Sequence, residues 1–264
     1  MALTPRLLPL AGLQSCSRYC TLSTCNFAFC KGTSLAIPLV KPIAAQRHAA
    51  VAYVTPFLVF VGVMGTEHAL AVPPQIGYPV RIALTLLALL LVSRREVKLR
   101  PASPLASAAV GLAVFAVWIA PDALVGYRHY WLFENFLTGK GSGMLSPDLQ
   151  GNLLFLLIRA AGSTLLVPVI EELFWRAWLM RWLIDRDFQR VPLGTYLPSA
   201  FWLTAVLFAS EHGSYWEVGL AAGVIYNWWM IRTRSLADCI LAHAVTNGAL
   251  AMYVVSAGAW QYWM

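Results

Sequence analysis

Long apolar stretches with few or no charged residues run through most of this chain, and they constrain its fold more than any other feature. Only 12% of the 264 residues are charged and 59% are hydrophobic, whereas about 25% of a typical soluble domain is charged. A spanning helix needs about 20 apolar residues. We therefore expect an all-α, polytopic membrane helix bundle with about seven to eight transmembrane helices. The expected spans are 48–66, 77–93, 101–121, 153–184, 195–212, 216–231 and 236–258.

Basic residues predict the orientation of these spans. With seven spans and a cytoplasmic N-terminus, the inside connections hold Arg94, Arg95, Lys98, Arg100, Arg181, Arg186, Arg190, Arg232 and Arg234, and the outside connections hold Arg128 and Lys140. Since Lys and Arg favour the cytoplasmic side, we expect a multi-pass protein of the bacterial inner membrane with its N-terminus inside. An eighth helix within 121–160 would break this parity. Five of the seven net positive charges lie in the N-terminal quarter, and the other basic residues cluster at the ends of apolar runs, so the charge does not indicate a nucleic-acid partner.

The first 47 residues differ in composition from the rest. They contain five basic and no acidic residues, as in a disordered or targeting-like extension. Their cysteines (Cys16, Cys20, Cys25 and Cys30) do not have the spacing of a CxxC zinc site. We therefore expect residues 1–47 to be an N-terminal extension and residues 48–264 to form the transmembrane domain.

Several ionisable residues interrupt the apolar spans, and each is expected either to pair with another group or to have a function. A charge at mid-membrane costs about 2.5–3.5 kcal/mol on insertion scales. Glu172 and Arg176 are four residues apart, so they share a helix face and can pair. Glu171 points about 100° away from Glu172 and is left to face a polar cavity, another helix or water. A carboxyl group in such a place is suited to act as a general base.

Two histidines and an asparagine accompany this glutamate on other spans. His212 ends one span, and His243 and Asn247 are four residues apart on another, so both project from one face. At 1.5 Å per residue, Glu171, His212 and His243 each lie about 11–18 Å from one end of their spans, near the middle of a core of about 30 Å. The sequence therefore predicts that three helices converge on one polar pocket.

These residues form three ordered motifs: Glu171-Glu172-x-x-x-Arg176, Phe208-x-x-x-His212 and His243-x-x-x-Asn247. They resemble the motifs of the CPBP intramembrane proteases, which include the CAAX prenyl endopeptidases and bacteriocin-processing relatives. The resemblance covers about residues 150–260. The segment 167–170 and the Trp260–Trp263 end are most similar to bacterial CAAX-protease-related proteins that are associated with exosortase systems.

The resemblance implies an intramembrane endopeptidase that cleaves a membrane-associated protein or peptide. It implies that Glu171 and His212 activate water, that His243 and Asn247 stabilise the oxyanion, and that Glu172 and Arg176 support them. A CAAX-type C-terminus, a sorting-signal protein of an exosortase system and a bacteriocin leader are all compatible substrates. We expect no cofactor, but zinc bound by Glu171, His212 and His243 stays open, although the sequence has no HExxH motif.

Two other functions remain open, and several residues carry secondary expectations. The chain is alternatively a non-enzymatic immunity or partner-binding protein, or a transporter with a proton relay.

Glu211 and Glu217 flank a turn where carboxylates usually lie on the surface, although either could assist. Pro168 is expected to kink its helix, and Gly219 and Gly223 to pack helices. Further residues are expected to form an interfacial aromatic belt: Trp228, Trp229, Trp260 and Trp263.

Overall fold

The computed structural model describes residues 43–133, 135 and 145–263, and the elements that position the site are all helical. The α-helices are α1 (Ile43–Ala69), α2 (Pro74–Ala88), α3 (Pro104–Val125), α4 (Pro147–Gln150), α5 (Leu153–Ala161), α6 (Val167–Glu172), α7 (Met180–Trp182), α8 (Pro198–Ser210), α9 (Trp216–Thr233) and α10 (Leu236–Ala257). This confirms the all-α expectation. Most of the predicted N-terminal extension, residues 1–42, lies outside the described residues, and α1 begins at Ile43.

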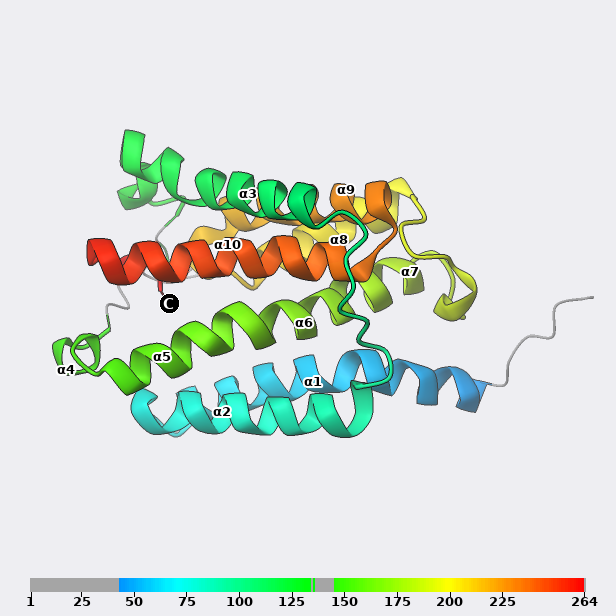
Figure 1. Ribbon diagram of the computed structural model, residues 1–264, viewed down its shortest axis with the longest axis horizontal. Coiled ribbons are helices and arrows are strands. Elements are labelled where there is room, and N and C mark those ends of the chain that lie inside the picture. Colours follow the sequence, from blue (N-terminus) through cyan, green and yellow to red (C-terminus); the bar gives the residue numbers. More distant parts are fainter. Residues whose placement is uncertain (1–42, 134, 136–144, 264) are drawn as a thin grey trace, which may run out of the picture. The chain divides into compact units, whose positions relative to one another are not determined.

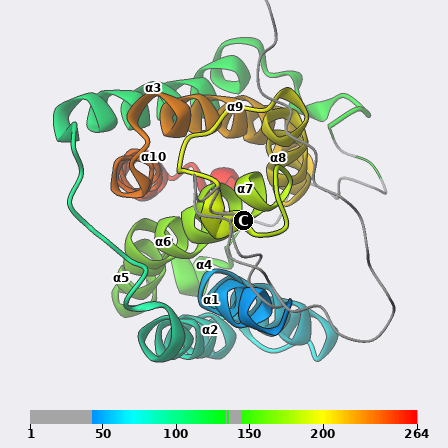
Figure 2. The same ribbon diagram turned by 90° about the vertical axis from the view of Figure 1, so that its right-hand side faces the viewer.

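Some consecutive helical elements join into one continuous helix, and we call each continuous long helix a rod. Two of these rods contain π-helical turns. The π-helical stretch η1 (Leu89–Ser93) prolongs α2. The stretches η3 (Gly162–Leu166) and η4 (Leu173–Leu179) join α5, α6 and α7 into one rod, Leu153–Trp182. The described residues therefore form seven rods, one at each range that the sequence predicts, and Figures 1 and 2 show them packed side by side.

Five of these rods are long and apolar enough to cross a membrane: α1, α2 with η1, α3, the rod 153–182 and α10. The number is lower than the seven or eight that composition predicts. Helix α8 is apolar but has only 13 residues, and α9 is less apolar because it carries Glu217, Asn227 and Arg232. No further rod appears in the described part of 121–160, where α4 has four residues.

Close backbone contacts hold α3 against α10. A Cβ atom on Gly111 would lie 2.3 Å from the carbonyl oxygen of Ala242, so only glycine permits this approach. At one end of the two helices, the Asp238 carboxylate accepts hydrogen bonds from the backbone N–H groups of Ala102 and Ser103, at 2.7 and 2.8 Å. These contacts fix the start of α10 beside the start of α3.

The C-terminal tryptophans do not form the expected interfacial belt. Trp229 is buried and donates a hydrogen bond to Ser107 Oγ, 3.2 Å away. Trp263 is buried too, whereas Trp228 is half exposed. The prediction is wrong for the two buried rings because hydropathy does not reveal which side of a helix faces protein and which faces lipid.

Candidate active site

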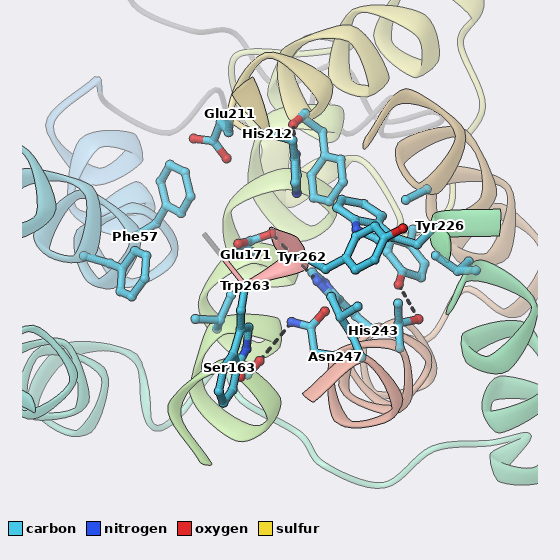
Figure 3. Close-up of a pocket in the computed structure, with 18 of the residues that line it drawn as sticks. Phe57, Ser163, Glu171, Glu211, His212, Tyr226, His243, Asn247, Tyr262 and Trp263 are labelled. Atoms are coloured by element: carbon cyan, nitrogen blue, oxygen red, sulfur yellow. Dashed lines mark hydrogen bonds and ion pairs between the residues drawn. The ribbon is translucent and has the colours of Figure 1, made fainter. Parts of the chain in front are cut away.

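A cavity of about 430 Å³ lies between the rods and is lined by all four predicted catalytic residues. Glu171 comes from α6, His212 follows α8, and His243 and Asn247 come from α10. Figure 3 shows these side chains gathered around one space, with Glu171 below His212 and beside His243. The structure thus brings together residues up to 76 positions apart from three separate helices, as the depth of each residue in its span predicts.

The pair predicted from spacing is present at the wall of this cavity. Arg176 donates to Glu172 Oε1 at 3.0 Å, and the Nδ1 atom of His243 lies 2.9 Å from the same oxygen. Both Glu172 and Arg176 are completely buried. Because a carboxylate only accepts, the hydrogen between His243 and Glu172 resides on Nδ1. The other ring nitrogen, Nε2, lies 4.0 Å from Glu171 Oε2.

Arg176 extends this pair into a network across four rods. Its Nε donates to Asn227 Oδ1 at 3.0 Å, and Asn227 donates from Nδ2 to the carbonyl of Phe201 at 2.9 Å. The ring of Tyr226 stacks on His243 with centroids 4.9 Å apart. Sequence reasoning missed Tyr226 and Asn227, although an asparagine in an apolar helix is itself a signal that a buried partner exists.

The tautomer of His212 follows from its hydrogen bond. Nδ1 lies 2.8 Å from the carbonyl oxygen of Phe208, and a carbonyl only accepts, so Nδ1 carries the hydrogen. In the neutral ring, Nε2 then has a free lone pair. The ring is held between Phe208 and Trp118, with centroids 4.8 and 5.3 Å away. His212 therefore presents an acceptor to the cavity in a fixed orientation.

Asn247 is oriented by a single backbone contact. Its Nδ2 donates to the carbonyl of Ser163 at 2.9 Å, the contact drawn in Figure 3. Ser163 belongs to η3, where the wider π-helical turn leaves carbonyls without their usual helical partner. Pro168 follows directly and lacks the N–H that an α-helix would need to bond Thr164. Where the sequence predicts a kink, the structure has a π-helical stretch before Pro168, and a carbonyl of this stretch lies against Asn247.

The part of the chain that carries these motifs matches a known family. Residues 152–249 match the family described as type II CAAX prenyl endopeptidase, Rce1-like. The match covers 98 of the 264 residues, so the part of the chain that carries the motifs is similar to this family. The resemblance predicted from the three motifs is confirmed over these residues, and it supports an integral membrane protease of the CAAX type. We found no significant match among curated proteins or among solved structures.

The CAAX-type site also contains a carboxylate that the sequence placed on the surface. Glu211 lines the cavity and lies near Glu171. Glu217 lies elsewhere: it forms an ion pair with Arg128 at 2.8 Å and accepts from Tyr127 at 2.9 Å. Glu211 is exposed, as expected for the turn after α8, and it lies at the edge of the cavity.

The residues of this CAAX-type site do not fit a zinc ion in the arrangement that the structure gives them. Among the described residues, no three His, Cys, Asp or Glu side chains are grouped closely enough to hold a metal. The Nδ1 atoms of both histidines are engaged by Phe208 and Glu172. A metal set of Glu171, His212 and His243 would thus require the side chains to move together.

Proposed function

We propose that this protein is an intramembrane endopeptidase that hydrolyses a peptide bond of a membrane-associated protein. The proposal rests on one observation: the four motif residues, from α6, the turn after α8 and α10, line a single cavity. The name of the matched family suggests a prenylated C-terminal peptide as the substrate class. A sorting-signal protein of an exosortase system remains the alternative substrate. We expect the protein in a bacterial inner membrane with its N-terminus in the cytoplasm.

In this proposal, Glu171 is the general base and His212 orients the attacking water. Glu171 Oε2 is buried and has no hydrogen-bond partner among the described residues, so it is available to take a proton. His212 Nε2 accepts a hydrogen bond from the same water. As the water loses its proton to Glu171, its oxygen adds to the carbonyl carbon. Glu171 then passes that proton to the amine as the C–N bond breaks.

His243 and Asn247 stabilise the oxyanion of the tetrahedral intermediate. In this proposal His243 donates to the oxyanion from Nε2, while Glu172 holds Nδ1 and fixes the orientation of the ring. Asn247 uses one amide hydrogen for Ser163 and has a second for the oxyanion. Arg176 keeps the charge of Glu172 in place. Two fixed donors of this kind are typical of acyl-transfer sites.

The test is the Glu171→Gln substitution in the full-length protein, reconstituted in liposomes with an internally quenched farnesylated CAAX peptide. The amide cannot take a proton, so we expect cleavage to fall by at least a thousandfold while the unfolding midpoint stays near that of the wild type. Glu67→Gln is the control, because Glu67 is a membrane carboxylate paired with Arg81 outside the cavity. Cleavage by Glu171→Gln at the wild-type rate would show that the assigned base is wrong.

A chelation arm separates the two versions of the mechanism. The reaction proposed here needs no metal, so activity should survive exhaustive dialysis against 1,10-phenanthroline and EDTA. Loss of activity that zinc restores would replace the glutamate mechanism with the zinc-dependent one. The substrate proposal is tested separately, since a peptide without the farnesyl group is expected to be a poorer substrate.

A further inference from the structure

A second cavity, of about 320 Å³, lies at the opposite end of the rods from the C-terminal segment that covers the candidate active site. It shares no lining residue with the first cavity. Three rods contribute to both: α1 provides Tyr53 to this cavity, the rod 153–182 provides Arg181, and α10 provides its first turn. The second cavity therefore lies at the end of the bundle where most basic residues gather.

Four basic side chains line this cavity, against one acidic side chain. They are Lys98, Arg100, Arg181 and Arg234, and the acid is Glu96. None of the four takes part in any ion pair of the described residues. Glu96 accepts a hydrogen bond from Tyr53, 2.6 Å away. The cavity wall thus holds an excess of three positive charges that the protein does not pair.

Arg181 is only 7% exposed. Its positive charge is therefore largely removed from water, which is unfavourable unless a negative charge lies nearby. Its guanidinium bonds to the carbonyls of Ala177 and Val191 and lies against the rings of Tyr53 and Phe188. These contacts hold the side chain in place, and the carboxylate of Glu96 interacts favourably with it, although no ion pair joins the two residues. One carboxylate does not neutralise four basic side chains, so an anion from outside the chain would stabilise this wall.

The first turn of α10 adds backbone donors to the same wall. Ser235, Leu236 and Ala237 line the cavity, and the Ser235 side chain caps the helix by accepting from the N–H of Asp238 at 3.3 Å. The Asp238 carboxylate is turned the other way, where it accepts from Ser103 and Ser107. The positive end of a 22-residue helix therefore faces the cavity alongside the four basic side chains.

We propose that this cavity binds a phosphate group, such as that of an anionic lipid headgroup or of a free phosphate. The arginine side chains suit phosphate because a guanidinium presents paired donors to two of its oxygens. The end of the rods where the cavity lies is where the lipid headgroups of one leaflet would be. This site is separate from catalysis, so its test does not depend on the proposed function.

The test measures binding to the delipidated full-length protein in dodecyl maltoside by isothermal titration calorimetry. The probes are dioleoylphosphatidylglycerol, dioleoylglycerol and inorganic phosphate. We expect the first to bind and the second, which lacks the phosphate, not to bind. The variant Lys98→Gln/Arg100→Gln/Arg234→Gln should weaken binding about a hundredfold, since each basic residue contributes roughly fivefold. All three side chains are exposed, so the substitutions should leave the fold intact.

The control is Arg94→Gln/Arg95→Gln/Arg232→Gln, which removes the same charge from exposed residues of the same end that do not line the cavity. It should change binding less than threefold. Binding of inorganic phosphate that competes with the lipid would show that the site takes any phosphate, and lipid binding alone would identify the headgroup as the source. Equal losses in both triple variants, equal binding of dioleoylglycerol, or binding of neither phosphate probe would overturn the proposal.

Discussion

The substitution Gly219→Ala tests whether the position of the His212 ring matters for the reaction. Gly219 lies on α9 directly behind that ring, and a Cβ atom there would lie 3.0 Å from Cγ and Nδ1 of His212. Ordinary contacts between such atoms are about 3.5–4.0 Å. The imidazole would therefore have to move by a few tenths of an ångström. The expected packing role of Gly219 is thus specific, because it leaves room for a proposed catalytic side chain.

The size of the expected loss of kcat depends on the contacts that hold the His212 ring. The hydrogen bond to Phe208 and the ring of Trp118 oppose the displacement, so the ring shifts and tilts rather than leaving the cavity. A misplacement of about 1 Å can reduce a rate about a hundredfold. We expect kcat to fall by about four- to tenfold, with a smaller change in KM. Stability should change little, because overpacking costs about 1–3 kcal/mol and replacing a helical glycine by alanine returns about 1 kcal/mol.

The assay is cleavage of the quenched farnesylated peptide in liposomes, with the unfolding midpoint measured by tryptophan fluorescence. The matched control is Gly62→Ala on α1, where an added Cβ meets nothing within 4 Å. This control carries the same gain in helix propensity without the clash. If Gly219→Ala keeps kcat within twofold of the wild type while Glu171→Gln is inactive, the fixed position of His212 plays no part in the chemistry.

Three further substitutions address the rest of the site. Arg176→Met should destabilise the protein by about 3–5 kcal/mol in SDS titration, because it leaves a buried carboxylate unpaired, whereas Arg190→Met, in a more exposed pair, should cost no more than about 1 kcal/mol. Asn247→Ala should lower kcat by about a hundred- to a thousandfold with an unchanged unfolding midpoint, and a loss below fivefold would remove it from the oxyanion site. Glu211→Gln should alter the pH dependence of kcat because it removes a charge from the cavity, while Glu217→Gln should leave that profile unchanged.

The sequence predicts where the rods are but not how deeply each is buried. Hydropathy locates all seven ranges because it records the average environment of about 20 residues. Helices α8 and α9 fall below the length or the apolarity of the other five because they pack on each other, with Gly223 placed against Ala205. The burial of Trp229 and Trp263 escaped prediction for the same reason, since burial depends on neighbours from distant parts of the chain.

Local spacing predicts the Glu172–Arg176 pair because both residues lie one turn apart on one rod. It cannot predict that His243 completes the pair, since that contact joins residues 71 positions apart. The place of Glu211 at the edge of the cavity has a similar origin, because it depends on how the turn after α8 packs against the other helices. Residue spacing thus identifies the members of the site, and only tertiary packing assigns their partners.

The two π-helical stretches of the rod 153–182 explain how one helix serves both the cavity and the buried network. They flank α6, which carries Glu171 and Glu172. Each wider turn rotates the residues that follow relative to an uninterrupted α-helix. One consequence is that the Ser163 carbonyl reaches Asn247, and another is that Arg176 bonds both Glu172 and Asn227. Asn247, one of the two proposed oxyanion donors, and Arg176, the partner of Glu172, are therefore positioned by irregular backbone on either side of the proposed base, at a place where regular helix would have directed these groups elsewhere.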